Sequence, residues 1–486
     1  MFLLISLIAC SGDDPGDTGP PPDAPPSSSG DSGGDGGDGG DGGDGGDGGD
    51  GGDGGDTGSY PSYDFGDAHA LLEGSGGEAA GAAMAAGDFD ADGAADLLIG
   101  APWATGGLTK AAGVAYLLTG PIDAGTRDIE DVATPWASST VYAELGTGLL
   151  LGDLDGDGTD DAVVGAPGLD TVYVLVGGAE ADIRFAPTLT GDEGTGAALA
   201  IADMGGPTLL VGAPRGKGES GSTVYAYVGV PEGSEALDGA IGRIVSNVES
   251  DAAGTSVANA GDTDGDGRDD LAIGAPGDEG GGGAVYLFER DLDGELDLDD
   301  AAVRLDGDSG SATGAQVVGV GDFDGDGLAD VLTGGADLDG SATESGVVYL
   351  ITGGSSGDLQ PNQLDFRIFG NQQGGRLGSA IAAPGDLDGD GLAEIVVCAA
   401  GTDSEDASDA GACLLVTGGE TGSLLVDPGE LGPWIYGDRS NREAGIVALA
   451  GADFTGDGTP DLLATAGSGV SGDSGEVFVW SGADLP

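Results

Sequence analysis

Residues 321–335 read GDFDGDGLADVLTGG, an acidic segment that runs directly into an apolar one. Asp322, Asp324, Asp326 and Asp330 are crowded together, although like charges repel. In the pattern D-x-D-x-D-G-x-x-D, the glycine at position 6 lets the backbone turn sharply, so oxygens at positions 1, 3, 5 and 9 can converge and position 7 can add its carbonyl. Because hard oxygen ligands in this number select Ca²⁺, the stretch predicts a calcium loop followed by a β-strand.

The acidic loop belongs to a repeat of seven units, spaced by 50 to 67 residues. The seven loops begin at Asp88, Asp153, Asp203, Asp262, Asp322, Asp386 and Asp453. In each unit a small-residue run such as GAAMAAG (81–87) precedes the loop, and apolar runs such as DLLIGAP (96–102) and GVAYLLTG (113–120) follow it. A less regular stretch such as AVRLDGD (302–308) completes the unit. Four β-like runs per unit predict an all-β fold, a seven-bladed β-propeller of four-stranded blades over residues 60–486.

The two ends of the repeat region complement each other. The seventh unit stops after EVFVWSG (476–482), one strand short, whereas AHALLEG (68–74) precedes the first inner strand without a unit of its own. We therefore expect residues 68–74 to supply the outermost strand of the last blade. This pairing would close the ring and remove a free sheet edge.

Six of the seven loops are candidate metal sites. Five carry four carboxylates each: Asp88/Asp90/Asp92/Asp96, Asp153/Asp155/Asp157/Asp161, Asp262/Asp264/Asp266/Asp270, Asp322/Asp324/Asp326/Asp330 and Asp386/Asp388/Asp390/Glu394. The seventh has Asp453, Thr455, Asp457 and Asp461, which we expect to form a weaker site. The third loop, in DMGGPTLLVGAP (203–214), is shortened and has lost the acids, so we expect it to be metal-free. Six copies of one spacing favour about six Ca²⁺ sites over ordinary Asp-Gly turns.

The amino-acid composition excludes some classes of binding partner. Asp and Glu number 87 against 13 Lys and Arg, a formal net charge of −74. Such a surface repels nucleic acid and anionic lipid headgroups and attracts divalent cations. The one histidine, His69, lies in the expected closing strand, and no Ser or Cys has the surroundings of a nucleophile. We therefore assign no catalytic residue and do not expect an enzyme.

The N-terminus predicts export. MFLLISLIAC (1–10) is too short an apolar run to span a bilayer, and it resembles a bacterial lipobox in which Cys10 becomes the lipid-modified first residue. The alternative is an incomplete secretory signal, and both place the protein outside the cytoplasm. Residues 11–59 are rich in Gly, Asp and Pro and include eight Gly-Gly-Asp triplets. We expect them to form a disordered linker that tethers the propeller.

The small-residue run, the acidic loop, the tripeptide GAP at 100–102, 165–167, 212–214 and 274–276, and the later G-x-V-Y strand resemble FG-GAP repeats. Such repeats form the seven-bladed propeller of integrin α chains and of many bacterial surface proteins. This chain departs from the pattern, since no Phe-Gly pair precedes the loops and units 5 to 7 replace GAP. The resemblance implies that the calcium loops join strands 1 and 2 on one face. It also implies that ligands meet the opposite face, formed by the 2–3 and 4–1 connections.

Under that resemblance, Trp103, Lys110, Arg215 and Lys217 fall in 2–3 connections, where they form a candidate face for an acidic or carbohydrate ligand. The alternative is that they are scattered, solvated residues. Arg376, Arg439 and Arg442 lie in the polar 4–1 connections at 370–378 and 437–445. Cys398 and Cys413 lie on consecutive runs of the sixth unit, where they form either a cross-strand disulfide or two buried free thiols.

These features together predict a calcium-binding propeller that is lipid-tethered at the outer membrane or cell surface, or secreted. Its expected role is adhesion or ligand binding, with a surface protein or a glycan as partner. One alternative is a purely structural envelope protein without a specific ligand. The other is a calcium-dependent enzyme that processes polysaccharides.

Overall fold

The computed structural model describes the chain from residue 62 to residue 484. Gaps within this range fall at residues 106–111, 179–187, 192–193, 216–220, 232, 238–239, 249, 279–281, 291, 337–341, 404–407, 427–433, 438–444, 446–447 and 468–473. The signal-peptide and linker predictions for residues 1–59 lie outside the described residues. Within the described part of the chain, no helix has the length and apolar character needed to cross a membrane.

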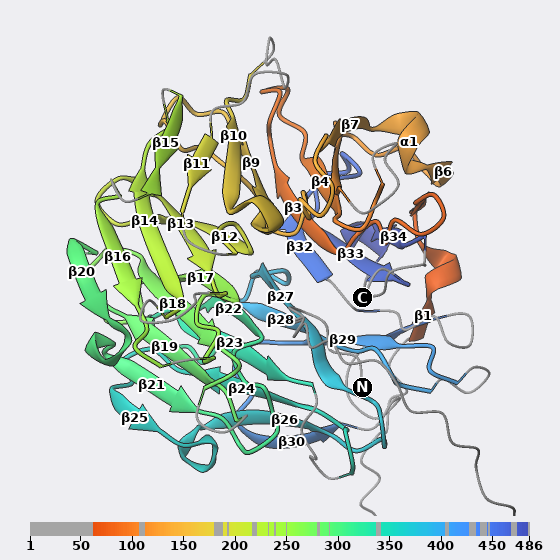
Figure 1. Cartoon of the computed structure of the whole chain (residues 1–486). Helices are drawn as coiled ribbons and strands as arrows, with labels where there is room; N and C mark the ends of the chain where they lie inside the picture. Colours follow the sequence, from red (N-terminus) through yellow and green to blue (C-terminus); the bar gives the residue numbers. More distant parts are fainter. Residues whose placement is uncertain are drawn as a thin grey trace, which may run out of the picture. The chain divides into compact units, whose positions relative to one another are not determined.

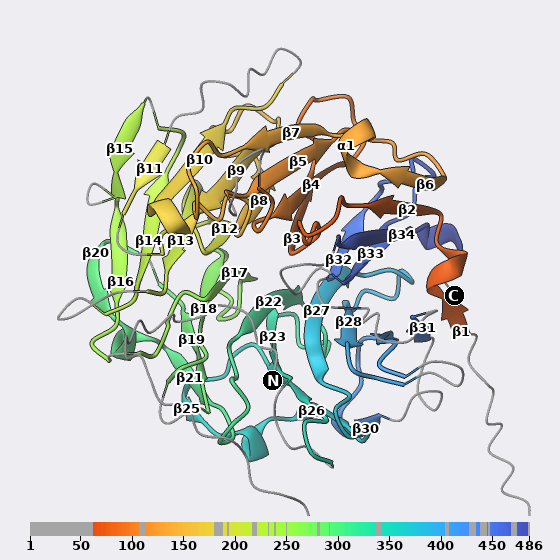
Figure 2. The same cartoon turned by 45° about the vertical axis from the view of Figure 1, so that its right-hand side comes forward.

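The described residues form a seven-bladed β-propeller (Figures 1 and 2). Blade 1 contains β3 (Ala83–Gly87), β4 (Asp96–Ala101), β5 (Val114–Leu118) and β7 (Thr134–Ala137). Blade 2 contains β8 (Leu149–Gly152), β9 (Asp161–Ala166), β10 (Thr171–Leu175) and β11 (Thr188–Thr190). Blade 3 contains β12 (Ala198–Asp203), β13 (Pro207–Ala213), β14 (Thr223–Val228) and β16 (Gly242–Val245).

The remaining blades repeat this antiparallel arrangement. Blade 4 contains β17 (Ser256–Gly261), β18 (Asp270–Ala275), β19 (Ala284–Phe288) and β21 (Val303–Asp306). Blade 5 contains β22 (Gln316–Gly321), β23 (Asp330–Gly335), β24 (Val347–Ile351) and β26 (Phe366–Gly370). Blade 6 contains β27 (Leu377–Gly385), β28 (Glu394–Ala399), β29 (Ala412–Val416) and β31 (Trp434–Tyr436). Blade 7 contains β32 (Ala448–Ala452), β33 (Asp461–Ala466), β34 (Glu476–Trp480) and β2 (Ala70–Glu73).

The innermost strands form a closed ring. Each of β3, β8, β12, β17, β22, β27 and β32 contacts the inner strand of the next blade, and β32 contacts β3, around the common centre visible in Figure 2. The small residues of these strands permit the close approach. A Cβ at Gly319 on β22 would lie only 2.1 Å from the carbonyl oxygen of Asn259 on β17, so a larger residue there would push the two blades apart.

The predicted ring closure is confirmed. β2 pairs antiparallel with β34 from Ala70 opposite Val479 to Glu73 opposite Glu476, and so forms the fourth strand of blade 7. His69 directly precedes this strand, and its Nε2 lies 3.2 Å from the carbonyl oxygen of Ile122. The N-terminal and C-terminal ends of the repeat region therefore share one sheet.

Six blades contain a fifth strand that the four-strand prediction missed. In blades 2 to 5 and 7 this strand comes from the connection between strands 3 and 4 of the next blade, and it pairs in parallel with the fourth strand. In the order of blades 2, 3, 4, 5 and 7, these strands are β15 (Ser234–Ala236), β20 (Gly294–Asp297), β25 (Gly357–Leu359), β30 (Gly422–Val426) and β6 (Gly125–Asp128). In blade 6 it is β1 (Ser62–Asp64), which precedes β2 and pairs with β31. Each of these strands joins the blade whose sheet it completes to the next blade of the ring.

A disulfide joins the second and third strands of blade 6. Cys398 on β28 lies directly opposite Cys413 on β29, with an S–S distance of 2.07 Å. Both residues are buried. Of the two alternatives raised by the sequence, the structure has the bonded form.

Candidate metal centre

The acidic loops join strand 1 to strand 2 in their blades, all at the same end of the sheets. In five of them, the carboxylates at positions 1, 3 and 9 each offer one oxygen, and these three oxygens lie within 4.8 Å of one another. The groups are Asp88/Asp90/Asp96, Asp153/Asp155/Asp161, Asp262/Asp264/Asp270, Asp322/Asp324/Asp330 and Asp386/Asp388/Glu394. The repeat thus brings together carboxylates that like-charge repulsion alone would separate.

Hydrogen bonds within each loop explain how the sequence sets this geometry. In the fifth loop, Asp322 accepts the N–H of Gly325 at 2.7 Å through one oxygen and the N–H of Gly327 at 2.9 Å through the other. Both glycines have positive φ, 84° and 88°, a conformation that favours glycine. The side chain at position 1 therefore organises the turn as well as contributing to the acidic group.

The carboxylate at position 9 is the buried member of each group. Asp330 accepts the N–H of Phe323 at position 2 of its own loop and the N–H of Gly353 beyond β24, each at 2.8 Å. Burial raises the pKa of Asp330 to about 6, while these backbone bonds act to lower it. Burial likewise raises the pKa of Asp161 to about 6. A buried carboxylate that stays ionised is costly unless a cation compensates it.

The carboxylate at position 5 accepts a hydrogen bond from the backbone N–H of position 7 in its own loop. This holds in five loops, at Asp92, Asp157, Asp266, Asp326 and Asp390. That position 5 also ligates a metal stays a prediction. The seventh loop folds in the same way, since Asp453 accepts the N–H groups of Gly456 and Gly458 and Asp461 those of Phe454 and Thr455.

The third loop is a tight turn. Asp203 ends β12, and β13 starts at Pro207. Asp203 accepts the N–H of Gly205 at 3.1 Å, and it is the only carboxylate between Ala202 and Ala213. The oxygen-only donor sets of the other loops fit a hard divalent cation, whereas one carboxylate does not supply such a set.

The opposite end of the sheets carries the predicted ligand face. Trp103 follows β4 and is half-buried. Arg215 follows β13 and forms an ion pair of 2.9 Å with Glu144. Arg376 lies between β26 and β27 with a φ of 57°. The other four predicted residues, Lys110, Lys217, Arg439 and Arg442, lie outside the described residues.

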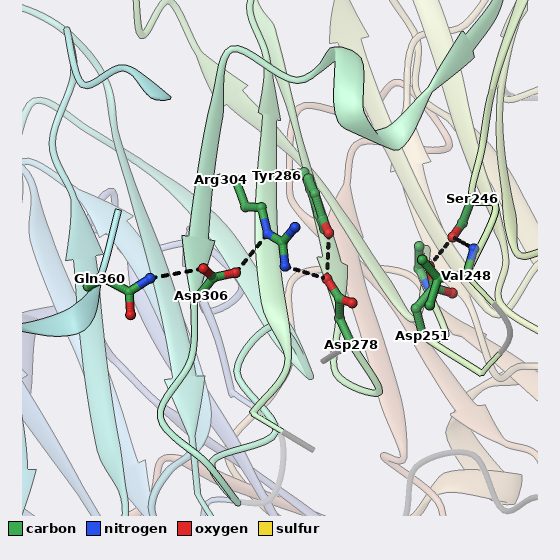
Figure 3. A network of polar contacts seen from close by, with 9 residues as sticks. Ser246, Val248, Asp251, Asp278, Tyr286, Arg304, Asp306 and Gln360 are labelled. Carbon is green, nitrogen blue, oxygen red and sulfur yellow. Dashed lines mark hydrogen bonds and ion pairs between the residues drawn. The ribbon is translucent and has the colours of Figure 1, made fainter. Parts of the chain in front are cut away.

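A partly buried polar network that the sequence pattern does not predict lies at this same end of blade 4. Figure 3 shows Tyr286 and Arg304 directed at Asp278, which is 2% exposed. Asp278 accepts hydrogen bonds from the Tyr286 hydroxyl and from Arg304 Nη2 at 3.2 Å. Arg304 Nε also donates to Asp306 at 2.7 Å, and Gln360 donates to Asp306 at 2.9 Å. Gln360 follows β25, so the network ties blade 4 to the chain of blade 5.

The tyrosine of the G-x-V-Y strand was the available signal for such contacts. The Tyr116 hydroxyl donates to Glu78 at 3.0 Å, and the Tyr349 hydroxyl donates to Asp308 at 2.9 Å. Burial raises the pKa of Tyr116, Tyr286 and Tyr349 well above the ordinary range, and the nearby carboxylates raise it further. The tyrosines therefore fix the third strands to connections at the end of the blades opposite the acidic loops.

Comparisons with known proteins agree with this architecture. A model of the FG-GAP repeat matches residues 80–118 and 253–288. Phosphatidylinositol-glycan-specific phospholipase D of Mus musculus is 33% identical over 181 residues, which cover 32% of this chain and 21% of that protein. Integrin alpha-5 of Xenopus laevis is 29% identical over 252 residues, which cover 47% of this chain and 23% of that protein. The chain therefore matches about a quarter of the length of these relatives.

Among solved structures, a crystal structure of BBS1N in complex with ARL6DN aligns with a TM-score of 0.43 and 12% identity, over 86% of this chain and 97% of that one. The two matches to the FG-GAP model contain the first and fourth acidic loops together with the strands on either side. The repeat unit found in the sequence and the blade found in the structure are therefore the same unit. The chain is a seven-bladed β-propeller in which two segments match the FG-GAP repeat, and it is similar in sequence to parts of integrin alpha-5 and of phosphatidylinositol-glycan-specific phospholipase D.

Proposed function

We propose that the six acidic loops bind Ca²⁺ and that the propeller is an extracytoplasmic module that binds a protein or a glycan. The observation that carries the calcium proposal is the recurrence of one oxygen-only group, with its three donor oxygens within 4.8 Å, in five described loops. An acidic cluster on one loop is common in proteins without a metal. Here five clusters share the same spacing, the same kind of hydrogen bonds and a buried ninth position, and this recurrence favours a metal site in each of them.

The residues assigned to the metal follow from the loop positions. Positions 1, 3 and 9 supply the carboxylates that the fold brings together, and position 5 and the carbonyl of position 7 complete the proposed set. The seventh loop, with Thr455 at position 3, is the weakest of the six. Bound Ca²⁺ supplies the positive charge that compensates the negative charge of the buried carboxylates at position 9.

The compartment is argued from two observations. The Cys398–Cys413 disulfide is of the kind that persists in oxidising surroundings, and the chain is similar to integrin alpha-5. Outside the cytoplasm, calcium is abundant enough to fill loops of modest affinity. A lipid attached at Cys10, followed by the Gly/Asp/Pro-rich linker, would tether the propeller to the membrane surface.

The ligand surface is assigned to the 2–3 and 4–1 connections, which lie at the end of the blades opposite the acidic loops. Trp103 offers an aromatic contact there. The Arg215–Glu144 pair is about one third exposed at each side chain, so the arginine remains accessible to a competing acidic group. Protein and glycan ligands are distinguished by binding assays of the calcium-loaded chain against glycan arrays and extracellular-matrix proteins.

Thermal unfolding with and without calcium tests the metal proposal directly. Millimolar Ca²⁺ should raise the melting temperature of the full chain, a chelator should lower it, and Mg²⁺ should not substitute. A ligand present at about 100 times its Kd stabilises the native state by about 2.7 kcal/mol per site. A melting temperature that is the same in chelator and in calcium would contradict the proposal.

Two other functions remain as alternatives. A structural envelope protein would give the same calcium response but would bind no glycan or matrix protein in those assays. The similarity to phosphatidylinositol-glycan-specific phospholipase D, which spans only part of that enzyme, is the observation that favours an enzyme. Release of product from polysaccharide or glycolipid substrates by the calcium-loaded chain would support the enzymatic alternative over the binding module.

A further inference from the structure

Neighbouring acidic loops are joined to each other by backbone hydrogen bonds. The N–H of position 8 in one loop donates to the carbonyl oxygen of position 1 in the preceding loop. Ala329 in the fifth loop donates to Asp262 in the fourth at 2.9 Å, and Ala393 in the sixth donates to Asp322 in the fifth at 2.8 Å. Asp160 in the second loop donates in the same way to Asp88 in the first, at 3.1 Å.

A second hydrogen bond accompanies the first. The backbone that follows strand 3 of one blade donates to the carbonyl oxygen of position 2 in the preceding loop. Gly354 donates to Thr263 at 2.8 Å, and Gly419 donates to Phe323 at 2.6 Å. Gly178 donates to Phe89 at 2.7 Å in the first and second blades. Each of these loop pairs is therefore held at two consecutive residues.

These bonds join residues that belong to two different acidic groups. Asp322 is position 1 of the fifth loop, and its carbonyl holds Ala393, which directly precedes Glu394, position 9 of the sixth loop. The backbone at Phe323 is also fixed from both sides, because its N–H donates to Asp330 of its own loop and its carbonyl accepts from Gly419 of the next blade. Gly418, the residue before Gly419, donates to Glu394. A shift of either acidic group therefore moves the backbone of the other.

We propose that the fourth, fifth and sixth loops bind Ca²⁺ cooperatively, with these backbone bonds as the coupling element; this inference rests on the proposed calcium function. Binding at the fifth loop orders Asp322 and Phe323 and so pre-orders the backbone that carries Glu394. By the reciprocity of linkage, binding at the sixth loop favours binding at the fifth. The first and second loops form a separate coupled pair through the same two bonds.

The sequence interrupts this series in two places. Position 8 of the seventh loop is Pro460, which has no N–H to donate to the sixth loop. The third loop does receive a bond, from Asp269 to the carbonyl of Asp203 at 3.2 Å, but it lacks the carboxylates to hold a metal. The coupled run therefore begins at the fourth loop and ends at the sixth.

Pro460 also supplies the design of the test. Ala393→Pro removes the N–H that joins the sixth loop to the fifth, with a residue that the repeat already accommodates at this position in the seventh loop. Ala393→Gly is the matched control, since it removes the side chain and keeps the donor. Asp324→Ala removes the side-chain oxygens of position 3, so it disables the fifth loop itself and is informative even if Ala393→Pro does not fold. Asp457→Ala in the seventh loop is its control, because Pro460 separates that loop from the sixth.

Calorimetric titration of the full chain with Ca²⁺ gives both the number of sites and the steepness of binding. For the unaltered chain we expect a Hill coefficient above 1 for a group of three sites. Ala393→Pro should keep every site, weaken binding several-fold at the sixth loop and lower the Hill coefficient, whereas Ala393→Gly should not. Asp324→Ala should remove one site and weaken two others several-fold, whereas Asp457→Ala should leave the affinities of the fourth to sixth loops unchanged.

Each contrary result has a distinct meaning. If the full chain binds no calcium, the proposed function is wrong and the coupling falls with it. If it binds calcium but Asp324→Ala removes one site and leaves all other affinities unchanged, the loops are independent and only the coupling is wrong. An Ala393→Pro isotherm identical to that of Ala393→Gly would likewise exclude the Ala393–Asp322 bond as the coupling element.

Discussion

Arg215 and Glu144 form an ion pair of 2.9 Å between the 2–3 connection of blade 3 and the 4–1 connection that leads into blade 2. The two residues are 71 positions apart in the chain. The pair places both kinds of connection on one face of the propeller. It also shows that Arg215, a candidate ligand residue, already has an acidic partner of its own.

We expect Arg215→Ala to lower the free energy of unfolding by less than about 1 kcal/mol, because both side chains are about one third exposed and solvent screens the pair. Chemical denaturation of Arg215→Ala, Glu144→Ala and the double variant measures the coupling energy. A coupling energy of several kcal/mol would mean that the ion pair stabilises the fold and that Arg215 is not available to an acidic ligand.

The buried ninth position predicts where calcium stabilisation is lost. Asp161→Asn should remove one metal site and reduce the calcium-induced rise in melting temperature, because a neutral amide cannot replace the ionised carboxylate. Asp203→Asn in the third loop is the matched control and should leave that rise unchanged. Differential scanning fluorimetry over a calcium series provides the comparison. Equal losses in both variants would contradict the assignment of loops with and without metal.

The disulfide of blade 6 predicts a large redox contribution to stability. The Cys398–Cys413 bridge spans 15 residues, and a loop of that length contributes about 3 kcal/mol in the chain-entropy model. Cys413→Ala should therefore destabilise the propeller by about 2–4 kcal/mol in non-reducing buffer. The same substitution should have a much smaller effect in reducing buffer, where the unaltered chain also lacks the bond. Cys10→Ser serves as the control that leaves blade 6 intact.

The closing strands predict the effect of an N-terminal truncation. Removal of residues 1–73 deletes β1 and β2 and exposes the edge strands β31 and β34 of blades 6 and 7. Unpaired edges template association between chains, so we expect aggregation, or a melting temperature many degrees lower. Removal of residues 1–59 is the control and should leave both the association state and the melting temperature of the full chain unchanged. Analytical ultracentrifugation and thermal unfolding distinguish the outcomes, and a soluble, equally stable 74–486 fragment would contradict the closure argument.

The buried tyrosines predict a loss of stability in alkali. Because the folded-state pKa values of Tyr116, Tyr286 and Tyr349 are raised, the folded protein keeps protons that the unfolded chain releases above about pH 10. The stability due to these groups is complete below that pH and falls as the pH rises beyond it. Spectrophotometric titration should find these three of the 10 tyrosines ionising only as the chain unfolds. Tyr286→Phe should reduce that late fraction by one.

Much of the fold could be predicted because local sequence patterns in each repeat unit indicate its strands and its turns. Small residues such as Gly319 marked the inner strands, and the run DVLTGG, which begins with Asp330, is a fully buried second strand. The missing strand of the last unit pointed to residues 68–74. For the inner and second strands, the residues carrying the signal lie within a few positions of the element that they define, whereas the closing strand followed from counting the strands of the last unit.

The fifth strands escaped prediction because they carry no such pattern. SEA (234–236) is exposed throughout, and GELD (294–297) buries only Leu296. They are held by backbone pairing in parallel to the fourth strand of the neighbouring blade, which no side-chain periodicity records. The same limit applies to the Arg215–Glu144 pair, because no local pattern relates two residues so far apart in the chain.

The fifth strands, each of which comes from the neighbouring blade, also have a consequence for how such a ring can change during evolution. The segment from one inner strand to the next encodes four strands of one blade together with the strand that covers the blade before it. A duplication of that whole segment therefore brings a strand that covers the blade before it. After a deletion of one segment, the strand from the following segment can cover the blade that precedes the deletion. The ring can gain or lose a copy of this segment without exposing a new unpaired strand, so its number of blades is open to change by simple genetic events.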